Sequence, residues 1–122
     1  YWTDKRIKAA ERYHQNLKNI GDLQLPIKVD NTVHVYHLYN LKTNYRDRLK
    51  DFLNKNGIGT TINYPVPLPF LKCYEYLNYD DSDFSVAKGT CNSILAIPLY
   101  PEIKEIDQEY VIEKIKEFFN KI

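Results

Sequence analysis

The residue types that most often carry chemistry in proteins are present in this chain but are dispersed along it. His34 and His37 are three positions apart in an extended stretch, which puts them on opposite faces of a strand and argues against a shared metal ion. Cys73 and Cys91 lack the CxxC spacing of metal and redox sites, so they are expected to be free thiols in a reducing compartment. His14 lies on the apolar stripe of a predicted helix, where a packed side chain is the usual finding. No metal site is predicted.

No other local pattern supplies a complete catalytic set. The segment Gly57-Ile58-Gly59 lacks the GxxxxGK[ST] pattern of a phosphate-binding loop and the helix that would follow it. These glycines are better explained as the end of a helix and a turn into a strand. Most acidic residues fall on predicted solvated helix faces, and no carboxylate pair stands in an apolar setting.

The most unusual segment is Tyr64–Pro69, with proline at every second position. Each proline ring fixes φ and removes an amide donor, so a stiff, extended arm is expected. Such a segment could be the ligand of an SH3-type domain, but a strand and a helix flank it, which favours a rigid wall. The 11 tyrosines could stack on nucleic-acid bases, yet a net charge of +1 and the absence of an RNP pattern argue against that partner.

The length and composition of the chain indicate its domain organisation and class. A chain of 122 residues with 43% hydrophobic residues fits one compact domain with a real core. No signal peptide and no apolar run of membrane-spanning length is seen, so a cytoplasmic protein without membrane contact is expected. The absence of methionine leads us to expect an excised piece of a longer protein.

Helical periodicity, caps and breakers divide the chain into elements. The predicted helices cover residues 3–20, 44–56 with Asn44 as N-cap, 70–77, a stretch capped by Ser82 or Asp83 and running to about Ser93, and about 107–122. The predicted strands cover residues 32–41, 58–64 and 94–99, with at best a short edge strand at 23–25. This order predicts an α+β fold, with helices packed on a small, mostly antiparallel or mixed sheet.

Several motifs together resemble a known family. They are Arg12-Tyr13, the strand Val35–Tyr39, the RDxL element beginning at Arg46 with Leu53 and Asn56-Gly57-Ile58, the segment Ile62–Leu68 against the family pattern IHYPxPL, and Leu95–Pro101 against LSLPLYP. Each motif is weak alone, but their order and spacing cover nearly the whole chain. The sequence therefore resembles the C-terminal (small) domain of the DegT–StrS family of pyridoxal-phosphate (PLP)-dependent sugar-nucleotide aminotransferases, which have fold type I.

The resemblance implies a cytoplasmic, homodimeric enzyme that moves an amino group from an amino acid, usually glutamate, to a keto-sugar on a nucleoside diphosphate. Such sugars enter lipopolysaccharide, capsule, glycan or antibiotic pathways. In this family the large domain carries the Schiff-base lysine, the carboxylate facing the pyridine nitrogen and most phosphate contacts, and those motifs are not found here. Residues 1–122 would then be a single C-terminal domain, with about residues 1–20 as the helix linking it to the large domain. The fragment alone would bind no PLP and catalyse nothing.

The resemblance also assigns substrate contact to Asn63 and Tyr64, at the start of the proline arm. The family usually has histidine where this chain has Asn63. An asparagine still donates and accepts hydrogen bonds but cannot titrate near neutral pH. Position 63 could instead merely fix the arm, and Tyr64 before a proline could serve packing.

Two other functions remain open at this stage. The family includes PLP-dependent sugar dehydratases in which the catalytic lysine is replaced, and that lysine lies outside the chain. A stand-alone module that holds a protein or glycan through the proline–tyrosine arm is the alternative from another class. The sequence does not identify the sugar, the carbon that is aminated or the nucleotide.

Overall fold

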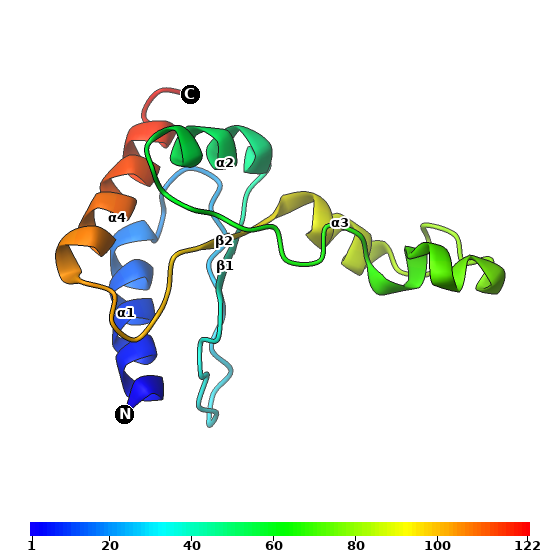
Figure 1. The fold of residues 1–122 in the computed structure, drawn as a ribbon, viewed down its shortest axis with the longest axis horizontal. Coiled ribbons are helices and arrows are strands. Elements are labelled where there is room, and N and C mark those ends of the chain that lie inside the picture. Colours follow the sequence, from blue (N-terminus) through cyan, green and yellow to red (C-terminus); the bar gives the residue numbers. More distant parts are fainter.

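Three helices cover one face of a small sheet, and a long projection leaves the opposite side of the molecule (Figure 1). The computed structural model describes all residues, 1–122. Its helices are α1 (Trp2–Leu17), α2 (Arg46–Lys55), α3 (Ser85–Ser93) and α4 (Glu105–Phe119), and its strands are β1 (Tyr39–Lys42) and β2 (Ile94–Ile97). Short 3-10 turns cover Leu68–Phe70 and Lys72–Leu77. The predicted α+β class with a small antiparallel sheet is confirmed.

The core is formed where α1, α2 and α4 meet one face of the sheet. Helix α4 packs against both α1 and α2. The Tyr13 hydroxyl donates to the Pro98 carbonyl at 2.8 Å, and the buried Gln108 amide donates to the Ala9 carbonyl at 2.6 Å. These bonds tie α1 to the end of β2 and to α4. The largest fully buried side chains are Tyr13, Leu17, Tyr39, Leu41, Leu49, Leu53, Leu95 and Ile115.

The two strands divide their side chains between the core and the opposite face of the sheet. Tyr39 pairs with Ile97 and Leu41 with Leu95, and these four side chains are buried in the core. Side chains alternate along a strand, so Asn40 and Lys42, paired with Ala96 and Ile94, lie on the other face. We call this the outer face of the sheet. Isolated bridges extend the sheet at both edges: Gln24 pairs with Lys42, and Thr61 pairs with Ala96.

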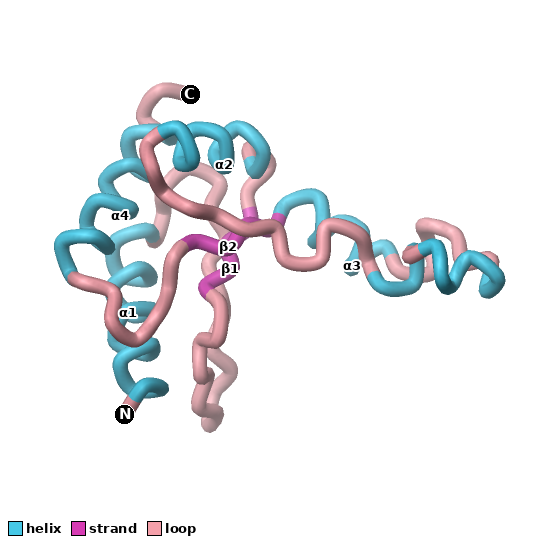
Figure 2. Tube along the Cα trace, in the orientation of Figure 1, coloured by secondary structure: helices cyan, strands magenta, loops and turns pink.

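The strand predicted at 32–41 was largely wrong, because only Tyr39–Lys42 finds a partner strand. Upstream, the Tyr36 amide donates to Nδ1 of His34 at 3.0 Å and Tyr36 has a φ of +45°, which closes a turn instead of continuing the extension. Val33 and Val35 are 74% and 51% exposed. β-branched residues favour a strand only where neighbours pack on both sides, and here the segment forms a loop beside α1 (Figure 2).

The strand predicted at 58–64 was also wrong in length. Thr61 alone bridges to β2, and Tyr64, with a φ of +60°, ends the extension. Strand β2 stops at Ile97, two residues before the predicted end, since Pro98 has no amide to donate. The predicted helix at 70–77 is present only as 3-10 turns.

Helix boundaries differ from the prediction by a few residues, and the predicted N-cap of α2 is wrong. Helix α1 ends at Leu17, before the left-handed residues Asn19 and Gly21. Asn44 does not cap α2: the Asp22 carboxylate accepts from the Asn44 amide at 2.8 Å and the Thr43 hydroxyl from the Tyr45 amide at 3.1 Å. Downstream, α4 begins at Glu105 rather than about Asp107.

Ser82 and Asp83 likewise do not cap α3, which begins at Ser85. Asp83 instead accepts from the Asp80 amide at 2.9 Å, and Ser82 donates to the Asp80 carboxylate. These contacts close a turn, and the hydrogen bonds that the Ser82 hydroxyl and amide donate to the Asp80 carboxylate lower the pKa of Asp80 from its ordinary value.

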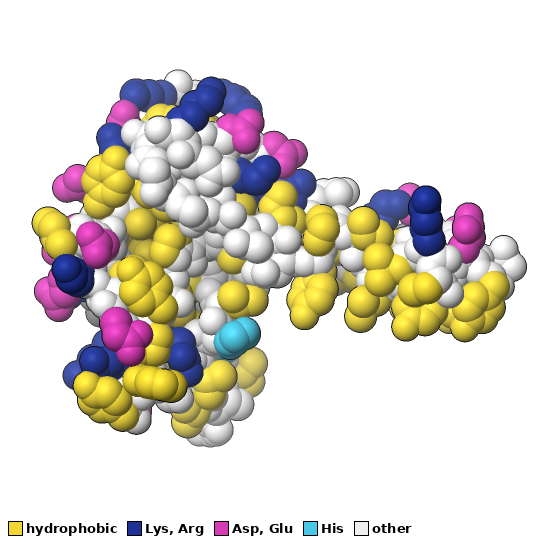
Figure 3. All heavy atoms as spheres, viewed as in Figure 1, with side chains coloured by type: hydrophobic (Ala, Val, Ile, Leu, Met, Phe, Trp, Pro, Cys, Tyr) yellow, Lys and Arg dark blue, Asp and Glu magenta, His cyan; other side chains and the backbone are white.

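Residues 64–93 form the projection, which carries both 3-10 turns and α3 away from the helices (Figures 1 and 2). None of these three elements has a buried residue. Phe84 contacts Phe70 and Tyr79 edge-on and gives the projection a small aromatic centre. Other apolar side chains line one of its edges in Figure 3. The projection therefore exposes most of its apolar side chains. No helix of the chain has the length and apolar character needed to cross a bilayer.

Candidate functional site

Asn63 reaches the outer face of the sheet from the segment that bridges to β2. Its half-buried side chain follows Thr61, whose backbone exchanges hydrogen bonds with Ala96 at 3.1 and 2.8 Å. From there the Asn63 amide donates to Oδ1 of Asn40 on β1 at 3.3 Å. The remaining groups of this amide pair, the Asn63 oxygen and the Asn40 NH2, make no hydrogen bond within the chain. The predicted site residue thus lies on an open polar face, with unused donors and acceptors.

Tyr64 starts the projection in a backbone conformation that tyrosine rarely adopts. Its φ is +60°, and a left-handed conformation costs a non-glycine residue about 1–2 kcal/mol. The side chain is 71% exposed, and its hydroxyl has no partner in the chain. The Tyr64 carbonyl accepts from the Cys91 thiol at 2.9 Å, which joins the two ends of the projection. Strain at an exposed residue, held by its surroundings, is typical of functional positions.

Residues of β1 and α2 anchor the returning end of the projection. The Arg46 guanidinium donates to the Cys91 carbonyl at 2.9 Å, and the Lys42 ammonium to the Thr90 hydroxyl at 3.0 Å. The Thr43 amide donates to the Ser93 carbonyl at 3.1 Å. The position of Tyr64 is therefore set by the sheet and α2 rather than by its own packing.

Beside Asn40, the outer face opens into a hollow of about 590 Å³. Its lining residues are Gln24, Leu25, Pro26, Ile27, Asn40 and Lys42. Sequence reasoning did not identify Asn40 or Lys42 as site residues. The signal was the alternation of the apolar Tyr39 and Leu41 with the polar Asn40 and Lys42. A shorter predicted strand would have placed Asn40 and Lys42 together on a solvated face.

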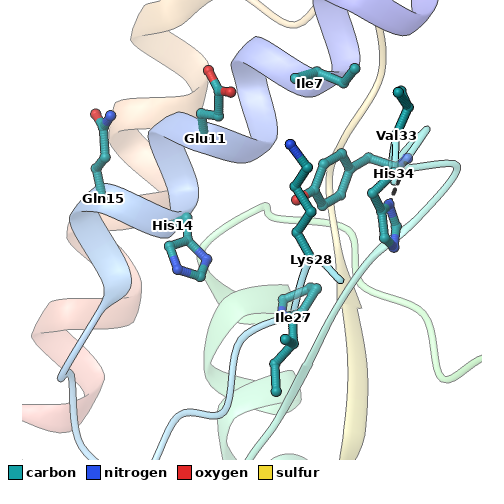
Figure 4. A pocket seen from close by; sticks show the side chains of 10 residues that line it. Ile7, Glu11, His14, Gln15, Ile27, Lys28, Val33 and His34 are labelled. Atoms are coloured by element: carbon teal, nitrogen blue, oxygen red, sulfur yellow. Dashed lines mark hydrogen bonds between the residues drawn. The ribbon is translucent and has the colours of Figure 1, made fainter. Parts of the chain in front are cut away.

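A second hollow, of about 580 Å³, lies between α1 and the loop that follows Pro26 (Figure 4). Its lining includes His14 and Glu11 of α1 and His34 and Lys28 of the loop. The His34 ring packs against the Tyr36 ring, tilted by 32° with 4.0 Å between ring centroids, and its Nδ1 accepts the hydrogen bond from the Tyr36 amide drawn in Figure 4. Nowhere in the chain do three or more His, Cys, Asp or Glu side chains come together as metal ligands.

No lysine of the chain fits the role of a Schiff-base lysine. A free amine is the reactive form, and burial usually produces it by lowering the pKa of the ammonium. None of the lysines is buried. A hydrogen bond with Tyr1 raises the pKa of Lys5, and one with Glu117 raises the pKa of Lys114, so both are held as ammonium ions.

Comparison with known proteins shows that this chain is similar to one family of aminotransferases. The model of the DegT/DnrJ/EryC1/StrS aminotransferase family matches residues 1–116. A pleiotropic regulatory protein of Geobacillus stearothermophilus is 38% identical over 120 residues, which are 97% of this chain and 32% of that protein. A dTDP-3-amino-3,4,6-trideoxy-alpha-D-glucose transaminase of Streptomyces venezuelae is 26% identical over 99% of this chain and 32% of its own length.

A solved structure agrees with these relatives. The chain superposes on S. venezuelae DesV, solved in complex with a ketimine intermediate, with a TM-score of 0.95 and 26% sequence identity. The match covers 99% of this chain and 33% of DesV. The chain thus spans about a third of the length of the proteins that it matches.

Proposed function

Because the chain belongs to the DegT/DnrJ/EryC1/StrS aminotransferase family, we propose that it is the C-terminal domain of a PLP-dependent enzyme that aminates a nucleotide-linked keto-sugar. The observation that carries the proposal is the Asn63–Tyr64 pair. A side-chain hydrogen bond to Asn40 holds Asn63 on an open polar sheet face, and Tyr64 follows it in a strained backbone conformation. Glutamate is the amino donor in this proposal, and the whole enzyme is a cytoplasmic homodimer.

The domain's share of the reaction is to bind the sugar and close the site, not to carry the amino group. PLP holds the amino group in transaminations of this family, and no lysine of this chain fits the role of its anchor. Asn63 has its amide oxygen free to accept from a sugar hydroxyl, while its NH2 remains bonded to Asn40. An asparagine here orients the substrate without exchanging a proton, since an amide does not titrate near neutral pH.

The exposed apolar surface supports a domain that packs against a larger body. On the projection, Tyr64, Tyr76 and Val86 are more than 70% exposed, and Leu68 is 60% exposed. Trp2, near the start of α1, is 61% exposed. Contiguous apolar side chains on a soluble protein usually mark an interface. We infer that residues 1–122 are one domain, that α1 links it to a preceding large domain, and that the projection lies on that domain.

The substitution Asn63→Ala in the full-length protein tests the site. We expect kcat/KM for the keto-sugar nucleotide to fall about tenfold, because a substrate hydrogen bond and the partner of Asn40 are both lost. The thermal midpoint should change little. Asn16→Ala is the matched control, since Asn16 is an exposed asparagine on α1 that bonds only to its own helix. Equal kinetics for the two variants would remove Asn63 from the site.

A further inference from the structure

The outer face of the sheet presents one cation beside the Asn40–Asn63 pair. Lys42 is two residues after Asn40 on β1, so both side chains lie on this face while Tyr39 and Leu41 enter the core. Lys42 is half-buried and lines the same hollow of about 590 Å³ as Asn40. An ammonium group and two amides therefore share one face.

Lys42 has no carboxylate partner in the chain. Several other half-buried cations do form ion pairs: Arg12 with Glu105, Arg46 with Asp47 and Lys114 with Glu117. Lys42 takes part in none of the ion pairs of the structure, and its ammonium donates only to the Thr90 hydroxyl, at 3.0 Å. An ammonium group carries three donors, so two remain for a ligand.

Asp22, the carboxylate closest to the backbone pairing of Gln24 with Lys42, already accepts hydrogen bonds from other groups. It lies two residues before Gln24, whose backbone exchanges hydrogen bonds with Lys42. One Asp22 oxygen accepts from the Thr43 hydroxyl and the other from the Asn44 amide. Both oxygens are thus used at the start of α2. The charge of Lys42 is left for a group from outside the chain.

We propose that Lys42 binds an oxyanion of a substrate at the outer face, next to the sugar contact of Asn63. The proposal rests on the function proposed above, which supplies two oxyanions, the carboxylates of the amino-acid donor and the diphosphate of the sugar nucleotide. Either anion would neutralise the half-buried cation, and charge-assisted bonds of this kind are about twice as strong as neutral ones. The unused amide groups of Asn40 and Asn63 would contact the uncharged part of the same ligand.

The kinetic test compares Lys42→Gln with Lys42→Arg in the full-length protein. Lys42→Gln should raise one KM by about 10- to 100-fold, the value expected for a lost charge-assisted bond, and Lys42→Arg should restore most of it. A rise in the KM for the amino donor assigns the donor carboxylate, and a rise in the KM for the sugar nucleotide assigns the diphosphate. Lys18→Gln, at an exposed lysine without an ion pair, is the control and should leave both constants unchanged.

Thr90→Val separates ligand binding from anchoring of the projection. This variant removes the bond between Thr90 and Lys42 but keeps the charge, so each KM should stay within about threefold of wild type, a change smaller than one ordinary hydrogen bond. If Thr90→Val reproduces the effect of Lys42→Gln, or if Lys42→Gln behaves like Lys18→Gln, Lys42 does not bind an oxyanion.

A calorimetric titration measures oxyanion binding by Lys42 directly, without an enzymatic assay. If the full-length protein shows no amino transfer, that result counts against the proposed function alone. The probes are glutarate, a dicarboxylate without an amine, and inorganic pyrophosphate. Wild type and Lys18→Gln should bind one probe at least about tenfold more tightly than Lys42→Gln does. Equal affinity in wild type and Lys42→Gln, or no binding of either probe to wild type, would overturn the proposal.

Discussion

Two tyrosines with positive φ offer a matched test of whether Tyr64 is kept for function or for packing. Tyr36 has a φ of +45° and is buried, with its ring 6.3 Å from that of Tyr39, centroid to centroid. Tyr64 has a φ of +60° and is 71% exposed. Replacing each by glycine relieves the same kind of backbone strain, but only Tyr36→Gly removes a buried ring.

The expected free energies of unfolding follow from this difference. Glycine at a left-handed position regains about 1–2 kcal/mol of strain. Its greater freedom in the unfolded chain costs about 0.5–1 kcal/mol. Tyr64→Gly should therefore leave the stability unchanged or raise it by up to about 1 kcal/mol. Tyr36→Gly also loses a buried aromatic side chain, worth about 3–5 kcal/mol, so it should destabilise by roughly 3 kcal/mol.

Urea denaturation of the 122-residue chain, followed by far-UV circular dichroism, measures both values. Assays of the full-length protein with a keto-sugar nucleotide give the functional half. We expect Tyr64→Gly to lower kcat/KM while the fold is kept. A loss of stability above about 1 kcal/mol on Tyr64→Gly would show that the ring packs, since exposed substitutions usually stay within about 0.5 kcal/mol. Unchanged kinetics would show that Tyr64 does not contact the substrate.

Three further predictions concern the body of the domain. Gln108→Leu should destabilise by about 1–3 kcal/mol in urea, because the buried Ala9 carbonyl loses its donor, whereas Asn16→Ala at an exposed site should change stability by less than about 0.5 kcal/mol. Gly21→Ala should lower the thermal midpoint, because the new Cβ would lie 2.1 Å from Cδ1 of Phe119 at a φ of +52°, while Gly59→Ala, with nothing within 4 Å, should be tolerated. Burial raises the pKa of Tyr13 and of Tyr39, so the stability that their neutral forms contribute is fully present below about pH 10 and is lost as the pH rises toward the folded pKa. Absorbance at 295 nm should then show both phenols ionising only together with alkaline unfolding, and ionisation in the folded state would contradict this.

The helices could be predicted because their signals are local. The apolar stripes of α1, α2 and α4 repeat at helical spacing, and the predicted spans overlap the observed ones within a few residues. Their ends depended on contacts from elsewhere in the chain, such as the Asp22 carboxylate, which accepts from the Asn44 amide just before α2, 22 positions away. No local pattern contains that contact.

The sheet was harder to predict because strands need partners. The alternation of residues 32–38 is as regular as that of Tyr39–Lys42, yet only the latter meets β2. Because residues 32–38 have no partner strand, they form a loop next to α1, and Val33 and Val35 are exposed to solvent. The outer face was missed for the same reason, since Asn40 meets Asn63 only when β1, β2 and the bridging Thr61 are in register.

The central claim is that this domain belongs to an enzyme that aminates a nucleotide-linked keto-sugar. The most direct test incubates the full-length protein, with PLP, with 15N-glutamate and a panel of keto-sugar nucleotides, and follows the products by mass spectrometry. The account predicts a sugar nucleotide in which 15N has replaced the carbonyl oxygen, formed more slowly by Asn63→Ala than by Asn16→Ala. A dehydrated sugar without 15N, or no change in any of the sugar nucleotides, would contradict it.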